Sequence, residues 1–299
     1  MSDINLVDLY QWCKIPYTEL ESHPQRKIPL LICRDSLEMG QIMANTLVDE
    51  IEIHNRRGEV TRAIIPCGPS GWYLHFTDLV NRKKVSLHNL VVFHMDECLD
   101  WQGNELPRGH PYNFRAFMEK WFYAPVDADL IVHEKNRIWL NAMNIEDVRR
   151  KIESAQVDIV IGGWGQDGHV AYNQAQRNSY RQVSVEDLRA STIRVQENNP
   201  DTILALAQRS FGTAYQFIPP MSVTLGMREI LSARKIRLYS DTGAWKQTAL
   251  RVALFGPETT EYPITLLQHH EDVLLTATIE TAQHPFELHD EWDFGLGVE

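Results

Sequence analysis

The segment GGWGQDGHVAYNQ (162–174) places an acid and a histidine two residues apart, directly after glycines. A carboxylate beside an imidazole can accept a hydrogen bond from the ring and fix its orientation and tautomer, so Asp167 and His169 could form an acid–base pair. The glycines suggest that the backbone comes close to a ligand here. A glycine-rich turn with an incidental histidine is the alternative interpretation.

A second acid, Asp96, stands at the end of the apolar run NLVVFHMD (89–96). A carboxylate partly withdrawn from water at a strand end could act as a general base, whereas Glu97 beside it would face elsewhere. A turn or helix-cap role is the alternative for Asp96. Asp96, Asp167 and His169 could also be metal ligands, but no HExxH motif or paired His/Cys spacing supports this, so no metal site is predicted.

Two further segments are suited to binding an anion. PCGPSG (66–71) follows an apolar run where a helix could begin, so free N–H groups and the positive end of the helix dipole would face a phosphate. In TGAWK (242–246), Lys246 opens another helical segment, and Arg209 in LALAQRSFG could add two parallel hydrogen bonds to phosphate. An ordinary turn and solvated surface charges are the alternatives. No Gly-Lys-Ser/Thr run follows the glycines, so the turn is not a Walker loop.

These residues need a framework that brings them together. Short apolar runs recur along the chain, and most are separated by segments of helical periodicity such as 36–57 and 246–255. This order predicts an α/β fold, a Rossmann-like and mostly parallel sheet with helices on both faces. The predicted strands are IPLLIC (28–33), RAIIPC (62–67), NLVVFHMD (89–96), VDIVIGG (157–163), KIRLYS (235–240) and EDVLLTAT (271–278).

Sheets of this kind bind ligands beyond the carboxyl ends of their strands. Four of the predicted strands run into polar, glycine-containing or acidic loops, which we expect to converge on one edge: CGPSGW, MDECLD, WGQDGH and DTGAWK. The irregular segment 177–220 could cover that edge. We predict one α/β domain over 28–280, an N-terminal extension (1–27) with one short helix, and a C-terminal tail (281–299).

Composition limits the classes of partner. The net charge of −11 argues against a nucleic-acid binder, which needs a basic face. The four cysteines are widely spaced, which disfavours a disulfide scaffold or a zinc site and fits a reducing compartment. No apolar run reaches eighteen residues and the first residues do not look like a signal peptide, so a cytoplasmic protein without a membrane span is expected.

Taken together, five motifs resemble the glucosamine-6-phosphate deaminase/isomerase family, which is related in fold to the 6-phosphogluconolactonases. The resemblance covers about 28–280, and the AYN that follows DGHV favours the deaminase branch. The motifs are, in order, PCGPSG, HMDE, GGWGQDGHVAYN, PPMSVTLGMREIL and GAWKQTAL.

The resemblance implies a substrate and a set of roles. Such an enzyme binds a 2-amino-2-deoxyhexose 6-phosphate, opens its ring, moves a proton between C2 and C1 and releases ammonia, with no metal or organic cofactor. Asp96 would carry the proton, and His169 would assist ring opening with Asp167 as its orienting partner. The family is commonly homo-oligomeric. The phosphate would be held by a cradle of Gly68, Ser70, Gly71, Arg209 and Lys246.

Gln174 departs from the family, which normally has Glu there to complete an acid–histidine–acid relay. An amide has nearly the same shape but cannot accept a proton or stabilise an imidazolium with a full charge. We therefore expect weaker proton transfer during ring opening, where general acid–base help contributes about 10²–10⁴-fold. Trp164, where a smaller aliphatic residue is usual, and Pro69, where Gly is usual, could reshape the pocket.

The leading hypothesis is an amino-sugar-phosphate deaminase/isomerase. One alternative is a 6-phosphogluconolactonase-like hydrolase or a plain sugar-phosphate isomerase, either of which would keep His169 as acid and base. Another is a non-catalytic phosphosugar sensor, which Gln174 would permit. Asp96 favours proton transfer between carbons over hydrolysis, and a sensor would need only the anion cradle.

Overall fold

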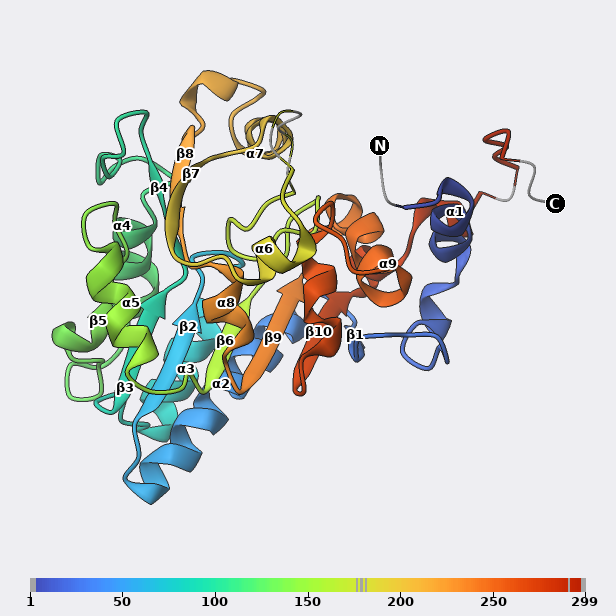
Figure 1. Cartoon of the computed structure of the whole chain (residues 1–299). Coiled ribbons are helices and arrows are strands. Elements are labelled where there is room, and N and C mark those ends of the chain that lie inside the picture. The colour runs from blue at the N-terminus through green and yellow to red at the C-terminus, as the bar shows by residue number, and fades with distance from the viewer. Residues whose placement is uncertain (1–3, 176, 178–179, 181, 290, 297–299) are drawn as a thin grey trace.

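The computed structural model describes the whole chain except residues 1–3, 176, 178–179, 181, 290 and 297–299. Its centre is a seven-stranded sheet in the order β1-β10-β9-β6-β2-β3-β5, in which every pairing is parallel (Figure 1). The predicted α/β architecture is therefore confirmed. The strands are β1 (Leu30–Cys33), β2 (Thr61–Ile65), β3 (Leu90–His94), β5 (Arg137–Ile138), β6 (Ile159–Gly162), β9 (Lys235–Ser240) and β10 (Val273–Thr278).

Helices cover both faces of this sheet, and successive strand residues point to opposite faces. In β2, Ile64 packs into one hydrophobic core while Ala63 and Ile65 pack into the other. Three helices contribute to the core around Ala63: α2 (Ser36–Arg57), α3 (Tyr73–Lys83) and α4 (Phe114–Met118), which a π-helical turn (Glu119–Tyr123) extends. The opposite core contains α5 (Ile145–Glu153), α8 (Met227–Leu231) and α9 (Gln247–Phe255).

Capping residues in the sequence determine where α2 begins and ends. Asp35 precedes the helix, and its side chain accepts a hydrogen bond from the N–H of Glu38. Gly58 follows the last turn with φ at +67°, a backbone conformation that glycine adopts without steric cost. The helix therefore occupies the same residues as the periodic segment 36–57.

A second, antiparallel sheet stands beyond the carboxyl edge of the first. Its strands are β4 (Asp96–Leu99), β8 (Met221–Thr224) and β7 (Arg194–Glu197), in that order (Figure 1). The sequence analysis did not foresee this sheet. It placed Asp96 at the end of a single strand, whereas β3 ends at His94 and Asp96 begins β4.

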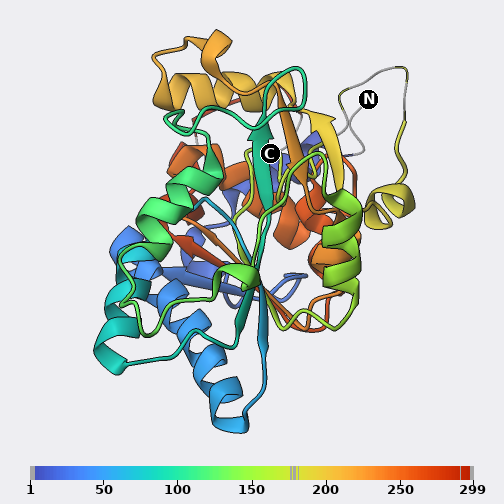
Figure 2. The same ribbon diagram turned by 90° about the vertical axis from the view of Figure 1, so that its left-hand side faces the viewer.

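The irregular segment 177–220 contains β7 and two helices, α6 (Val185–Arg189) and α7 (Pro200–Ser210). Figure 2 shows α7 above the main sheet, beside the loop that leads into α4. The two are joined by Tyr112, whose hydroxyl lies 3.4 Å from Ser210 Oγ and whose ring packs against Phe211. The expectation that this segment covers the carboxyl edge is thereby confirmed for its described residues.

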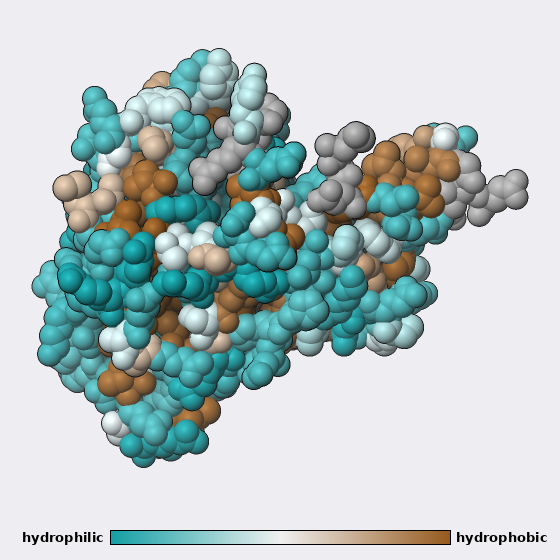
Figure 3. All heavy atoms as spheres, viewed as in Figure 1, coloured by the Kyte–Doolittle hydropathy of each residue, from teal (hydrophilic) through white to brown (hydrophobic). Residues whose placement is uncertain are grey.

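The N-terminal helix and the C-terminal segment pack against each other beside α9 (Figure 1). The N-terminal helix α1 (Leu6–Lys14) contacts the C-terminal segment through Tyr10, whose ring lies 5.7 Å from those of Phe286 and Phe294. Hydrophobic residues gather on the surface at this end (Figure 3). A short helix, α10 (Ile279–Ala282), follows β10. Among the described helices, none is long and apolar enough to cross a membrane.

Candidate active site

A cavity of about 470 Å³ opens at the carboxyl edge of the main sheet. Residues from all four predicted loops line it, following β2, β3, β6 and β9. Parallel strands end at the same edge, so their loops meet although β2 and β9 end at residues 65 and 240, which are 175 residues apart in sequence. The predicted convergence is confirmed.

Most of the predicted site residues reach this cavity, and three do not line it. Asp167 lies directly behind His169, Gly71 is exposed outside the cavity, and Gln174 is buried next to it. Trp164 and Pro69, the two other departures from the family pattern, are lining residues. The predicted residues that line the cavity are Gly68, Ser70, Asp96, His169, Arg209 and Lys246.

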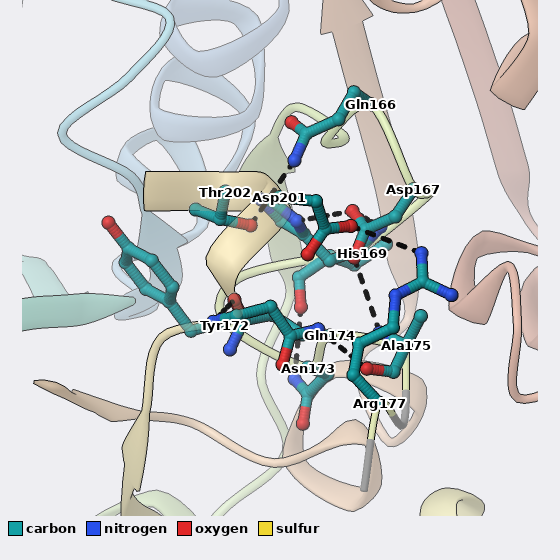
Figure 4. A network of polar contacts seen from close by, with 12 residues as sticks. Gln166, Asp167, His169, Tyr172, Asn173, Gln174, Ala175, Arg177, Asp201 and Thr202 are labelled. Atoms are coloured by element: carbon teal, nitrogen blue, oxygen red, sulfur yellow. Dashed lines mark hydrogen bonds and ion pairs between the residues drawn. The ribbon is translucent and has the colours of Figure 1, made fainter. Parts of the chain in front are cut away.

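Asp167 and His169 form the expected pair. His169 Nδ1 lies 2.6 Å from Asp167 Oδ1, and Asp167 Oδ2 accepts a hydrogen bond from the N–H of Ala175 at 3.3 Å (Figure 4). Burial raises the pKa of Asp167, but the positive charge and hydrogen bond of His169 outweigh it and hold the pKa well below its usual value. With Nδ1 donating to an ionised Asp167, the ring presents Nε2 as the nitrogen free for proton transfer.

Two glycines make this pairing possible. Gly168, between the pair, has φ at +71°, where a side chain would be strained. The Cα of Gly165 faces the imidazole of His169 so closely that a Cβ there would overlap the ring. Glycine is therefore required at 165 for the ring to occupy its place.

Asp96 lines the cavity from the start of β4. No described residue donates a hydrogen bond to its carboxylate. Burial, with a smaller contribution from the negative charge of Glu97, raises the pKa of Asp96 to about 8. A carboxylate with so high a proton affinity is suited to removing a proton from carbon near neutral pH.

Lys246 and Arg209 make the cavity attractive to an anion. Neither forms an ion pair with an acid among the described residues. Burial, with a smaller contribution from the charge of Arg209, lowers the pKa of Lys246 to about 8. The Arg209 guanidinium lies over the ring of Trp245, 5.9 Å from its centroid. Two cations without acidic partners at one cavity, together with the polar turn at 68–70, are suited to binding an anion.

The structure does not bring Gln174 to His169. The Gln174 amide Nε2 donates to the carbonyl oxygen of Glu197 at 3.1 Å, and Oε1 accepts from the N–H of Asn199 at 2.8 Å. Both polar atoms are thus bonded to the backbone between β7 and α7. The side chain at the position where the family has its relay Glu is therefore turned toward this backbone.

Aromatic side chains that were not predicted from the sequence also line the cavity, among them Tyr112, Phe114 and Tyr172. Tyr172 stacks against His169, with ring centroids 6.0 Å apart, and its hydroxyl lies 3.4 Å from Cys98 Sγ. Its position three residues after His169 could have suggested a place at the site. No sequence motif indicated Tyr112 or Phe114, because they reach the cavity only through the fold of the loop before α4 and the start of that helix.

Comparison with curated proteins finds glucosamine-6-phosphate deaminases. The chain is 30% identical over 252 residues to a glucosamine-6-phosphate deaminase of Bacteroides fragilis, a match that covers 81% of this chain and 86% of the relative. It is 27% identical over 269 residues to the glucosamine-6-phosphate deaminase of Caenorhabditis elegans, covering 85% and 94%. No family model matches the chain.

Solved structures share the fold. A monomeric glucosamine-6-phosphate deaminase superposes with a TM-score of 0.71 at 22% identity, over 85% of this chain and 98% of that one. The 6-phosphogluconolactonase of Trypanosoma cruzi superposes with a TM-score of 0.60 at 18% identity, over 85% and 95%. At these identities the structural likeness speaks for the fold alone.

Proposed function

This chain belongs to the glucosamine-6-phosphate deaminase family, and we propose that it is an amino-sugar-phosphate deaminase/isomerase. Its substrate is a 2-amino-2-deoxyhexose 6-phosphate, and its products are a ketose 6-phosphate and ammonia. The observation that carries the proposal is one cavity lined by two cations without acidic partners, by the buried carboxyl of Asp96 and by His169, which Asp167 holds from behind.

The phosphate end of the substrate binds to Lys246 and Arg209. Ser70 and the backbone around Gly68 contribute hydrogen bonds from the loop after β2. A phosphate with nearly two negative charges relieves the repulsion between the two cations and favours the protonated form of Lys246. Binding energy from this remote group holds the sugar in place for the chemistry.

Ring opening falls to His169. Its Nε2 takes the proton of the C1 hydroxyl, and the imidazolium returns a proton to the ring oxygen as the C1–oxygen bond breaks. Asp167 stabilises the imidazolium and keeps the ring oriented, through the 2.6 Å hydrogen bond. Because Gln174 is bonded elsewhere, this pair works without a second acid.

Asp96 then moves the proton between carbons. It removes the proton from C2 of the open aldehyde while a proton of the substrate ammonium group passes to O1, giving an enolamine. It then returns a proton to C1, which leaves an iminium at C2. Water adds at C2 and ammonia departs, leaving the ketose 6-phosphate. The positive charge of the substrate amine beside Asp96 favours its ionised form, so the carboxylate becomes available when substrate binds.

The homo-oligomer expected from the family resemblance stays a prediction. The solved deaminase that shares this fold is monomeric. Light scattering of the purified protein decides between the two states.

The proposed function is tested by ammonia and ketose-phosphate release from glucosamine, galactosamine and mannosamine 6-phosphates, with 6-phosphogluconolactone as a control substrate. Turnover of an amino sugar with formation of both products supports the proposal. Hydrolysis of the lactone alone would identify a lactonase. Binding of amino-sugar phosphates without any turnover would identify a sensor.

A further inference from the structure

The beginning of α7 is fastened to the loop that carries His169. Gln166 Nε2 lies 3.2 Å from Thr202 Oγ1 (Figure 4). Asn199 Nδ2 donates to the carbonyl oxygen of Ala175 at 2.6 Å. Arg177 adds an ion pair to Asp201 at 3.1 Å. These contacts join Gln166, Ala175 and Arg177 to the beginning of α7.

Apolar packing contributes little to holding α7. Its fully buried residues are Thr202, Ala205 and Ala207, all with small side chains. Leu204 is exposed, and Arg209 lies exposed at the rim of the cavity near the end of the helix. Because hydrophobic stabilisation scales with buried apolar area, polar contacts must supply much of the positioning of α7.

Gln174 lies at the centre of this attachment and is only 8% exposed. Its amide donates to the last residue of β7 and accepts from the residue that precedes α7, so it bridges the connection between them. The bridge needs one donor and one acceptor on the same planar group. A carboxylate of the same shape has no proton to donate and would face the Glu197 carbonyl oxygen with a negative charge.

We propose that Gln174 is a positioning residue for phosphate binding: it fixes α7 to the His169 loop and thereby places Arg209 at the anion site. The inference rests on the proposed function in that the bound anion is the phosphate of the substrate. It gives the amide at 174 a use that a proton-relay acid could not fulfil. Gln174 acts through Arg209 and touches neither substrate nor reacting atoms.

The test compares Gln174→Glu and Gln174→Met with the wild type. The first removes the donor, and the second removes both hydrogen bonds at similar volume without adding charge. We expect the dissociation constant for inorganic phosphate and the KM for the amino-sugar phosphate to rise about five- to tenfold, the size of one net hydrogen bond. The kcat should change less than twofold. Unaltered phosphate binding in Gln174→Met overturns the proposal.

Gln268→Glu is the matched control. The Gln268 amide donates to the carbonyl oxygens of Ala253 and Gly256, so the same substitution removes the same kind of bond away from the cavity. It should lower the melting temperature and leave phosphate binding unchanged. Loss of phosphate affinity in this variant equal to that in Gln174→Glu would mean that general destabilisation explains both and would overturn the proposal.

A double-mutant cycle separates positioning from a general structural role. In an Arg209→Ala background, Gln174→Met should weaken phosphate binding no further, because the residue through which it acts is gone. Additive losses would overturn the proposal. If the Gln174 variants fail to fold, Asn199→Ala tests the same attachment by removing the bond to Ala175, and it should raise the same dissociation constant.

The pH dependence of kcat distinguishes a positioning role of Gln174 from a role in the proton relay. If residue 174 took part in the proton relay, Gln174→Glu would raise kcat and add an ionisation to its pH dependence with KM unchanged, and this result would overturn the proposal. Absence of ammonia release by the wild type would instead refute the proposed function. The phosphate titrations do not depend on turnover, so the two failures are distinguishable.

Discussion

Asp96 and Glu97 are neighbours in β4, yet their carboxylates have opposite environments. Glu97 accepts hydrogen bonds from the N–H groups of Phe114 and Arg115, each at 2.8 Å, and so holds the start of α4. Asp96 faces the cavity and has no hydrogen-bond donor among the described residues. Successive side chains of a strand point to opposite faces, so Glu97 binds the backbone at the start of α4 while Asp96 faces the cavity.

Replacing Asp96 with Asn should abolish most turnover and retain substrate binding. The amide keeps the shape but cannot take a proton from C2, so kcat should fall by about 10²–10⁴-fold. Ammonia release measures turnover, and calorimetric titration with the amino-sugar phosphate measures binding. Glu97→Gln is the control, since it should cost stability while turnover persists. Equal losses of binding and turnover in Asp96→Asn would contradict the assigned role.

The same substitution should stabilise the fold in a pH-dependent way. The pKa of Asp96 is raised from 3.8 to about 8 by burial, so the folded state binds a proton that the unfolded state has already released between these pH values. The wild type therefore loses stability as pH rises from 4 to 8, whereas Asn at 96 does not titrate. Denaturant unfolding at pH 8 should show Asp96→Asn more stable by about 5 kcal/mol, with little difference at pH 4. A difference independent of pH would contradict this explanation.

The pH profile of kcat/KM should have a narrow maximum near pH 8. Asp96 must be ionised to act as a base, so activity rises as pH approaches its pKa of about 8. Lys246 must be protonated to hold phosphate, and its pKa is lowered to about 8, so activity falls at higher pH. Lys246→Arg should remove the alkaline fall, because guanidinium stays charged. An unchanged alkaline limb in this variant would remove Lys246 from the anion site.

Adding one methyl group at Gly165 should disable His169. A Cβ there overlaps the imidazole ring, which must leave its place and its hydrogen bond to Asp167. We expect Gly165→Ala to lower kcat by about 10²-fold, the contribution of positioned acid–base catalysis. Gly109→Ala is the matched control, because its Cβ would meet open space. Full activity of Gly165→Ala in the ammonia assay would show that the ring is not needed in this position.

The apolar runs predicted six of the seven strands of the main sheet, because each of these strands is a continuous local run. The seventh, β5, has only two residues and was not predicted. β9 occupies the predicted residues 235–240. The antiparallel sheet escaped prediction because its strands have only four residues and several polar ones, as in DECL and RVQE. Its pairing joins Asp96 to Thr224 across 128 residues, so tertiary contacts, and not local pattern, determine it.

The candidate site was also predictable from the sequence only in part. Asp96, His169 and Lys246 follow predicted strands, and parallel topology is enough to bring them to one edge. The orientation of Gln174 was not predictable, because it depends on backbone groups at Glu197 and Asn199, which only the fold brings near. The motif position of Gln174 therefore suggested the proton relay of the family, whereas its hydrogen bonds in the structure attach it to the backbone between β7 and α7.

The proposed mechanism requires the Asp96 carboxylate to carry the proton between C2 and C1 of the substrate. We would incubate C2-deuterated glucosamine 6-phosphate with the wild type and with Asp96→Asn, and follow ammonia release and the position of deuterium by NMR. We expect the wild type to release ammonia and part of the deuterium to reappear at C1 of the ketose phosphate, while Asp96→Asn binds substrate and does neither. Ammonia release by Asp96→Asn at the wild-type rate, with the same deuterium transfer, would show that another group carries the proton.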